Sequence, residues 1–263
     1  MDRYALITGA SSGIGKALAF QFAENGYNLI LVADHEEGLL ATAHELANIR
    51  PHAQLITIVK DLTDPNGAVE IFNQLERKNV EIHALVNNAG VGQHGYFKDI
   101  ELERDIYLIR LNIEAVTRLI KLFLPAMLRR GEGKILNVGS IAGFQPGPML
   151  AVYHATKAYV VSLSEALAEE LKDTNITVTC LCPGPTATRF FQRAEMEDAR
   201  IIQQGHLMSA NEVAEAAFEG LKHRERIVIP GATNKVLTFM RRVMPIALQA
   251  KLNKKFYEEV EER

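Results

Sequence analysis

The chain has 263 residues, of which 48% are hydrophobic and 23% charged, and its formal net charge is −3. This composition predicts a single packed domain over residues 1–263, and the charge gives no general attraction to nucleic acid. No run of about 18 apolar residues predicts a membrane-spanning helix. No basic and apolar leader precedes the first predicted strand, so we expect a cytoplasmic protein.

The first predicted element is a short apolar strand over residues 4–8, which ends in a glycine-rich turn over residues 8–15. A helix-period pattern follows over residues 16–23. Strand, glycine turn and helix in this order are typical of a phosphate-binding site, because the free N–H groups of the helix start point at the ligand. The alternative is a tight connection that binds no ligand.

The second predicted strand covers residues 28–33 and stops at Asp34. In nucleotide-binding folds, an acid at this point bonds the adenosine ribose and repels a 2′-phosphate. Asp34 could equally cap the helix predicted over residues 36–47. A third strand over residues 55–59 is followed by a helix to about residue 78, with Asp64 as its cap and Pro65 as its first residue.

A fourth strand over residues 82–86 leads into Asn87-Asn88-Ala89-Gly90, and residues 96–129 then read as two helices. Asn112 lies within the second of them, where a buried asparagine would need hydrogen-bond partners and an exposed one would not. The fifth strand, over residues 133–138, places Ser140 just beyond its carboxyl end.

Tyr153 and Lys157 are spaced at i and i+4 on a helix predicted to continue to about residue 172. Such residues lie on one helix face, one turn apart. An ammonium group beside a phenol lowers the phenol pKa, so the pair could exchange a proton with a substrate near neutral pH. His154 points about 100° away from Tyr153, and we predict that it is not catalytic.

A sixth strand over residues 176–181 contains Cys180 and leads into Cys182. We expect both cysteines to be buried reduced thiols rather than a metal site. Residues 189–208 are a candidate lid over the strand ends. A helix with a capping box follows over residues 209–221, and residues 227–229 form the last short strand.

The tail over residues 235–263 mixes apolar and basic residues, and Pro245 should interrupt any helix there. A basic amphipathic helix can lie on a membrane surface. Packing of this C-terminal extension on its own domain or on a partner subunit is the favoured interpretation.

Strands that alternate with helices predict an α/β fold with a doubly wound parallel sheet of about seven strands, of the Rossmann type. The chain resembles the short-chain dehydrogenase/reductase family. The features that carry this resemblance span residues 8–188 in the expected order. They are the glycine turn, Asp61, Asn87-Asn88-Ala89-Gly90, Asn112, Ser140, Tyr153-x-x-x-Lys157 and Pro183-Gly184.

The resemblance implies a nicotinamide cofactor, a hydride transfer between it and a secondary alcohol or ketone, and no metal. It also implies which residues line the cofactor site. They are Gly9, Ser11, Ser12, Gly13, Ile14, Gly15, Asp34, Asp61, Leu62, Asn88, Ala89, Gly90, Tyr153, Lys157, Pro183, Gly184, Thr186 and Thr188.

The resemblance further implies the catalytic roles of four residues. Ser140 bonds the substrate oxygen, and Tyr153 is the general acid or base. Lys157 lowers the tyrosine pKa and bonds the nicotinamide ribose. Asn112 holds a water that connects Lys157 to solvent.

The choice between NAD and NADP depends on few residues. Members that use the phosphorylated cofactor often have a basic residue at the position of Ser12 or an Arg at that of Asp34, and this chain has neither. The acid of NAD-using members usually falls one residue earlier, where this chain has Ala33. We favour NAD, with NADP as the alternative.

Two other functions compete with this interpretation: a non-catalytic protein that retains the nucleotide site, and an NADP-dependent, membrane-associated carbonyl or ketoacyl reductase. The loops at 91–99, 141–149 and 189–208 should form an apolar substrate pocket. The residues expected to line it are Val91, Phe97, Phe144, Met149, Phe190, Phe191 and Met196. The family resemblance implies a homodimer or homotetramer, with the helices at 101–130 and 150–172 as its interface.

Overall fold

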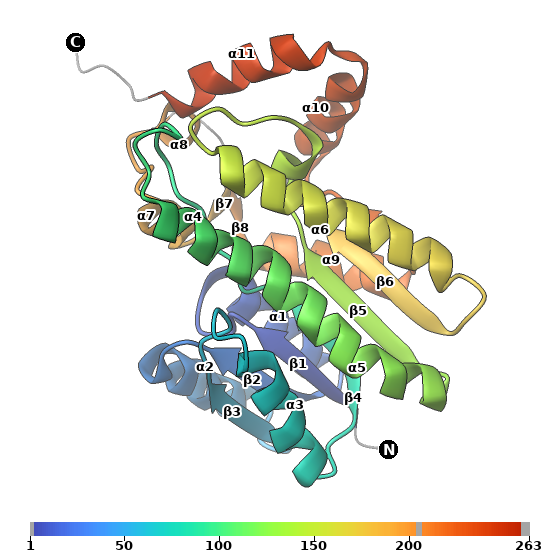
Figure 1. The fold of residues 1–263 in the computed structure, drawn as a ribbon. Coiled ribbons are helices and arrows are strands. Elements are labelled where there is room, and N and C mark those ends of the chain that lie inside the picture. The colour runs from blue at the N-terminus through green and yellow to red at the C-terminus, as the bar shows by residue number, and fades with distance from the viewer. Residues whose placement is uncertain (1–2, 204–206, 259–263) are drawn as a thin grey trace.

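The computed structural model describes residues 3–203 and 207–258, which form a parallel sheet covered by helices on both faces (Figure 1). Seven strands are ordered β3-β2-β1-β4-β5-β6-β9, and every neighbouring pair is parallel. This confirms the predicted doubly wound sheet. The strands are β1 (Tyr4–Thr8), β2 (Asn28–Ala33), β3 (Leu55–Val59), β4 (Ile82–Asn87), β5 (Gly133–Val138), β6 (Ile176–Leu181) and β9 (Ile227–Val228).

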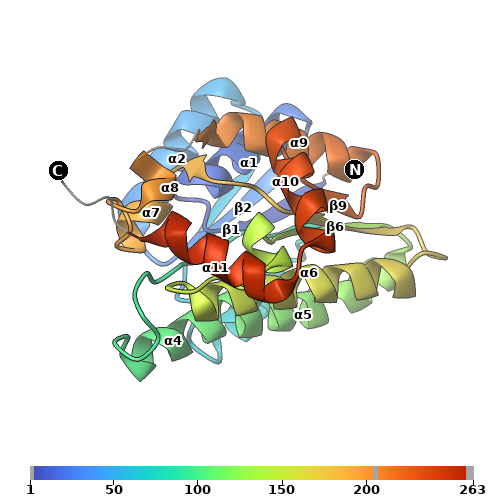
Figure 2. The same cartoon turned by 90° about the horizontal axis from the view of Figure 1, so that it is seen from above.

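The strand order reverses direction between β1 and β4, and ligands bind in such sheets beyond the carboxyl ends of the strands at that point. Figure 2 shows α1, α2 and α9 on one face of the sheet and α4, α5 and α6 on the other. The helices of these two layers are α1 (Gly13–Glu24), α2 (Glu36–Ile49), α3 (Gly67–Arg77), α4 (Leu102–Ile109), α5 (Val116–Arg130), α6 (Ala151–Glu170) and α9 (Ala210–Lys222).

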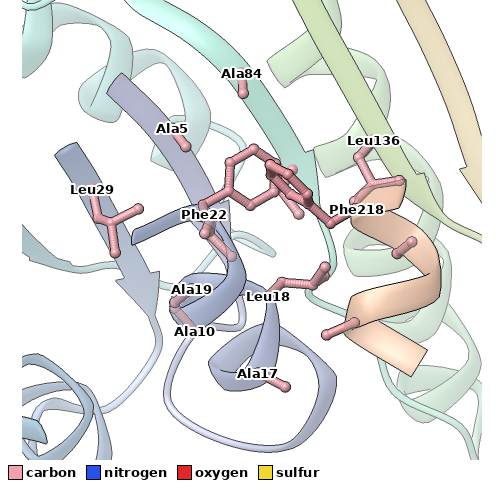
Figure 3. Close-up of a cluster of buried hydrophobic side chains, with 14 of the residues drawn as sticks. Ala5, Ala10, Ala17, Leu18, Ala19, Phe22, Leu29, Ala84, Leu136 and Phe218 are labelled. Atoms are coloured by element: carbon pink, nitrogen blue, oxygen red, sulfur yellow. The ribbon is translucent and has the colours of Figure 1, made fainter. Parts of the chain in front are cut away.

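A hydrophobic core lies on each face of the sheet. On the α1 side, the ring of Phe22 packs edge-on against Phe218 of α9, with 5.0 Å between ring centroids (Figure 3). On the other side, Phe72 of α3 packs against Phe123 of α5 at 5.3 Å. Because the central strands are buried on both faces, they read as continuous apolar runs in the sequence.

Two helix boundaries differ from the prediction. The segment predicted as two helices over residues 96–129 begins at Leu102 and is one continuous run, in which the π-helical turn η1 (Arg110–Ala115) joins α4 to α5. The helix predicted to start at Pro65 begins at Gly67 instead. The carboxylate of Asp64 accepts a hydrogen bond from the N–H of Asn66, which makes a turn ahead of the helix.

Beyond β6 the chain forms smaller elements around the carboxyl ends of the strands. They are β7 (Thr186–Ala187), α7 (Phe190–Arg193), α8 (Arg200–Gln203), β8 (Met208–Ser209), α10 (Ala232–Val243) and α11 (Ile246–Tyr257). The predicted lid therefore contains two short helices, although its residues 204–206 lie outside the described part of the chain.

The C-terminal extension is two helices, and the break between them at Pro245 confirms the predicted interruption. Residues 259–263 of the extension lie outside the described residues. The predicted capping box of α9 is present, with both Ser209 and Glu212 bonded as expected. None of the described helices has the length and apolar character needed to cross a membrane.

Candidate active site

Three polar side chains meet at the carboxyl ends of β4, β5 and β6. Ser140 follows β5 directly, and Tyr153 and Lys157 lie in the first two turns of α6. All three border one cleft of about 650 Å³, a volume typical of small-molecule sites. The glycine turn borders the same cleft, so the sequence motifs that lie far apart in the chain share one cavity.

Ser140 is buried, and its hydroxyl is fixed by the start of the short 3₁₀ helix η2 (Ile141–Phe144). The Oγ atom accepts a hydrogen bond from the N–H of Ala142 at 3.0 Å. The carbonyl oxygen of Pro183 lies 3.5 Å from the same Oγ, a long hydrogen bond. These neighbours fix the hydroxyl at the cleft that Tyr153 also lines.

Burial raises the pKa of Tyr153 to about 12, and only the hydrogen bond with Ser140 acts in the opposite direction. The expected lowering of this pKa by Lys157 is therefore wrong for the structure described. Loss of solvation disfavours the phenolate more than the neighbouring groups stabilise it. The protein thus keeps Tyr153 as a neutral phenol, which is the form that donates a proton.

The amine of Lys157 donates a hydrogen bond to the carbonyl oxygen of Val138 at 2.8 Å. Its Nζ lies 5.8 Å from the centroid of the Tyr153 ring. Burial lowers the pKa of Lys157 to about 8, while the buried thiols of Cys180 and Cys182 act to raise it. Both cysteines are free, as predicted.

Asn112 is buried in the π-helical turn η1, where each of its amide groups has a protein partner. Its Oδ1 accepts from the N–H of Val91 at 3.1 Å, and its Nδ2 donates to the Val91 carbonyl and to Thr156 Oγ1. A Cβ placed on Gly90 would lie 3.1 Å from Asn112 Oδ1 and 3.4 Å from Lys157 Nζ. Asn112 and Lys157 therefore approach each other across Gly90.

The glycine turn has no room for side chains at two of its positions. Gly9 has a φ of 65°, which favours glycine, and a Cβ on Gly15 would lie 2.2 Å from the Gly9 carbonyl oxygen. Asn88 clamps this turn, since its Nδ2 donates to the carbonyl oxygen of Thr8 at 2.8 Å. The residues of the turn that line the cleft are Gly9, Ser11, Ser12, Gly13, Ile14 and Gly15.

This cradle fits a dinucleotide. The start of α1 borders the cleft, and its glycines at 13 and 15 carry no Cβ atoms to obstruct a pyrophosphate that approaches the backbone N–H groups. The other predicted cofactor residues also border the cleft. They are Asp34, Asp61, Leu62, Asn88, Ala89, Gly90, Pro183, Gly184, Thr186 and Thr188.

Two carboxylates border the cleft just beyond β2 and β3. Asp34 bonds the imidazole of His35 at 2.7 Å, a neighbour that the sequence analysis did not weigh. Asp61 accepts hydrogen bonds from the backbone N–H and the hydroxyl of Thr63, both at 2.8 Å. Within the part of the chain that is described, no group of three His, Cys, Asp or Glu side chains could hold a metal ion.

The opposite end of the cleft is apolar. Val91, Phe190, Phe191 and Met196 line it, as predicted. Three other predicted lining residues do not border it. Phe97 is 67% exposed on the surface, and Phe144 packs among Val160, Val161 and the two cysteines. Met149 packs against the buried cluster that contains Leu150.

The sequence analysis missed the contribution of the C-terminal helices to this pocket. Leu237 of α10 and Asn253, Phe256 and Tyr257 of α11 line the same cleft. The signal that could have found them is the polar spacing at 249, 253 and 257, which marks one face of α11.

His154 does not border the cleft but ties its parts together. Its Nδ1 bonds the carbonyl oxygen of Gln145 at 2.8 Å, and its Nε2 bonds the hydroxyl of Tyr257 at 2.9 Å. The helix that carries Tyr153 is thereby attached to α11. A buried chain from Asn87 to Asn137 and on to Ser164 similarly joins β4, β5 and α6, and it was also missed.

A family model for short chain dehydrogenases matches residues 3–199. A very-long-chain 3-oxoacyl-CoA reductase of Laccaria bicolor is 36% identical over 179 residues, 66% of this chain and 52% of that protein. The chain thus spans about half the length of that relative. The oxidoreductase UcpA of Escherichia coli K12 is 34% identical over 246 residues, which cover 88% of this chain and 92% of UcpA.

Solved structures with the same fold cover nearly the whole chain. A short-chain dehydrogenase from Sphingobium yanoikuyae in complex with NADPH has a TM-score of 0.81 and 34% identity, over 93% of this chain and 97% of that one. The bulky-bulky ketone specific alcohol dehydrogenase from Comamonas testosteroni has a TM-score of 0.77 and 33% identity, over 91% and 92%. The chain therefore belongs to the short-chain dehydrogenase/reductase family.

Proposed function

We propose that the protein is a nicotinamide-dependent oxidoreductase that interconverts a secondary alcohol and a ketone. The observation that carries this proposal is that Ser140, Tyr153 and Lys157 border the same cleft as the glycine turn at the start of α1. When bound, the cofactor supplies or accepts the hydride. The protein positions the substrate and moves the proton.

In the reducing direction, the Ser140 hydroxyl binds the substrate carbonyl oxygen, and Tyr153 gives its phenolic proton to that oxygen. The raised pKa of Tyr153 supports the donor role, because the phenol is fully protonated at neutral pH. In the oxidising direction the phenolate oxygen of Tyr153 takes the proton from the alcohol hydroxyl. Proton transfer by such a group contributes about 10²- to 10⁴-fold to a reaction rate.

Lys157 and Asn112 help to carry the proton that Tyr153 exchanges with the substrate to and from solvent. With its pKa at about 8, Lys157 can gain or lose a proton close to neutral pH. We assign to Asn112 two tasks: holding Val91 against η1, and holding a water between Lys157 and solvent. The proximity of Asn112 Oδ1 and Lys157 Nζ to Gly90 supports the second task.

NAD is the cofactor we propose, on the basis of Asp34 at the adenosine end of the cleft. A carboxylate there bonds ribose hydroxyls and repels a 2′-phosphate. Relatives with solved structures include complexes with either cofactor, such as the Sphingobium yanoikuyae enzyme with NADPH and a Burkholderia phymatum enzyme with NAD.

The substrate we propose is an apolar, bulky ketone or its alcohol. The side chains beyond Tyr153 that line the cleft are largely aromatic and aliphatic. The Comamonas testosteroni relative is described as specific for bulky-bulky ketones, which supports the same class of substrate. Residues 189–208 act as the lid, since Phe190 packs at 5.2 Å from the Tyr153 ring.

We further propose that the chain assembles as a homodimer or homotetramer through the long helices α4, α5 and α6. Leu102, Ile106 and Ile109 of α4 and Tyr159 of α6 are large apolar side chains exposed there. Two copies that pack these helices together would bury them.

The test is a screen of ketones and alcohols with NADH, NADPH and their oxidised forms, followed by the absorbance of the reduced cofactor. We expect turnover of bulky apolar ketones, with NADH favoured. A preference of tenfold or more for NADPH would overturn the cofactor assignment. Cofactor binding without turnover of any compound would instead support a regulatory nucleotide-binding protein.

A further inference from the structure

The helices α10 and α11 bury polar residues and expose apolar ones, the reverse of an ordinary surface helix. On α11 the buried side chains are Gln249, Asn253 and Tyr257, which lie one turn apart on one face. On α10, Thr238 is buried while its neighbour Phe239 is 68% exposed. We call the exposed apolar side chains of both helices the C-terminal apolar face: Val236, Leu237, Phe239, Met240, Ile246, Leu248, Leu252 and Phe256.

Hydrogen bonds attach the inner face of α11 to the domain, together with the packing of Tyr257 in the buried cluster that contains Leu150 and Met196. Asn253 donates to the carbonyl oxygen of Pro146 at 2.6 Å, and Tyr257 bonds His154 at 2.9 Å. The carbonyl oxygen of Tyr257 also bonds the imidazole of His94 at 2.8 Å. These bonds fix which side of α11 faces inward, so the outward position of its apolar side chains is set by the fold.

Figures 1 and 2 show α10 and α11 as an elbow at the edge of the domain, beyond the carboxyl ends of the strands. Exposed apolar patches of this kind on soluble domains mark interaction surfaces. We therefore infer that this face binds a partner. The charge of the two helices indicates what kind of partner it is.

Residues 232–257 contain six basic residues and no acidic one, although the whole chain has a net charge of −3. Acidic residues resume at Glu258, which lies 3.8 Å from Lys254. Among the residues that the structure describes, Lys251 and Lys255 have no ion-pair partner, and both are exposed beside Leu252 and Phe256. The apolar face is thus bordered by uncompensated positive charge.

A second copy of the chain would bring the same positive charge to the interface, because a two-fold interface pairs a surface with itself. An anionic membrane offers the opposite charge together with an apolar phase for the exposed side chains. We propose that the C-terminal apolar face docks on anionic lipid membranes, with α10 and α11 lying in the plane of the interface and the basic residues at the headgroups.

The docked face adjoins the substrate cleft. Leu237 and Phe256 belong to the C-terminal apolar face and also line the cleft, so its entrance would open toward the membrane. This link rests on the proposed function, because it would give an apolar ketone a direct route from the lipid to Tyr153. The docking itself does not depend on catalysis.

The test is flotation of the full-length protein with vesicles of phosphatidylcholine alone or with phosphatidylglycerol added. We expect flotation with the anionic vesicles only, and weaker binding as salt screens the lysines. Phe239→Ser combined with Leu252→Ser should lower the partition coefficient by about tenfold or more. Lys251→Glu combined with Lys255→Glu should do the same for the anionic vesicles.

The matched control is Leu40→Ser combined with Ile49→Ser, which removes exposed apolar side chains from α2, remote from the elbow. It should bind vesicles as the native protein does. Thermal unfolding checks that all variants fold, and none of the substituted residues lines the cleft. Absence of native binding to anionic vesicles, or binding that neither pair of substitutions weakens, would overturn the proposal. So would a dimer that Phe239→Ser and Leu252→Ser dissociate, because a second copy would then cover the face.

Discussion

The sheet with its two helix layers and the α10–α11 elbow bury opposite kinds of side chain. In the layers, large apolar side chains such as Phe22 are fully buried, and the polar side chains gather at the carboxyl ends of the strands. In the elbow, Asn253 and Tyr257 are buried, and Phe239 and Leu252 are exposed.

Different forces stabilise the two regions. Burial of apolar surface stabilises the layers and positions the reaction site. In the elbow, the inner face of α11 is held by hydrogen bonds and by the packing of Tyr257. Its outward residues therefore contribute little to folding and are free to serve binding. Five experiments test this contrast between the two regions.

The largest effect should come from Tyr153→Phe. This substitution removes the phenolic hydroxyl that donates the proton to the substrate. We expect turnover to fall by about 10²- to 10⁴-fold. Cofactor affinity, measured by NADH fluorescence titration, should change little, because the glycine turn is untouched. Ser164→Ala, outside the cleft, is the control for general damage to α6. A variant that keeps native turnover would remove Tyr153 from the mechanism.

A second comparison sets Phe22→Ala against Phe239→Ala. The first opens a cavity between α1 and α9 and should lower the free energy of unfolding by about 3–5 kcal/mol. The second removes an exposed ring and should change it by less than about 0.5 kcal/mol. Urea denaturation of both variants measures the difference. Equal losses would show that the elbow is held by its apolar residues after all.

The pH dependence should differ between the two reaction directions. Burial raises the pKa of Tyr153 to about 12, so the phenolate that alcohol oxidation requires is scarce at neutral pH and grows as the pH rises. Oxidation should therefore accelerate from pH 7 to 9, by at most about tenfold per pH unit. Reduction should not accelerate, because the phenol is present throughout. Initial rates in both directions decide this, and oxidation that slows over the same range would contradict it.

A smaller change is expected from Asp34→Ser at the adenosine end. Loss of the carboxylate removes the repulsion of a 2′-phosphate and one partner of the ribose. The ratio of NADPH to NADH affinity should rise by about tenfold, which corresponds to about 1.4 kcal/mol. Glu45→Ser on α2, which pairs with Lys16, is a control for lost surface charge. An unchanged ratio would mean that Asp34 does not select the cofactor.

The smallest effect should come from Tyr257→Phe, which removes one hydrogen bond between α11 and His154. We expect a loss of about 1 kcal/mol in stability, measured by urea denaturation. The substrate KM should rise more than kcat falls, because Tyr257 lines the apolar pocket and not the proton path. A large fall in kcat at unchanged KM would place Tyr257 closer to the chemistry than the structure does.

The same contrast explains what the sequence could predict. The strands, the glycine turn and Ser140 were predictable because alternating elements fix a parallel sheet, and such a sheet brings strand ends together. The π-helical turn at Asn112 was not, since its partners Val91 and Thr156 come from other segments.

Two properties of the site depended on three-dimensional surroundings. The i, i+4 spacing predicted a lowered pKa for Tyr153, yet burial by residues distant in the sequence raised it. The entry of α11 into the pocket was hidden because the apolar pattern of that helix marks its outer face. Its polar residues, Asn253 and Tyr257, are the ones that face the protein.

The central claim is that this cleft brings a nicotinamide ring, a substrate carbonyl and the Tyr153 phenol together. The most direct test uses NADH deuterated at the nicotinamide C4 position, with a ketone that the screen identifies. The account predicts deuterium on the carbinol carbon of the alcohol formed by the native enzyme, and almost no labelled alcohol from Tyr153→Phe. Alcohol without deuterium from either deuterated face of the cofactor, or equal labelling by the variant, would contradict it.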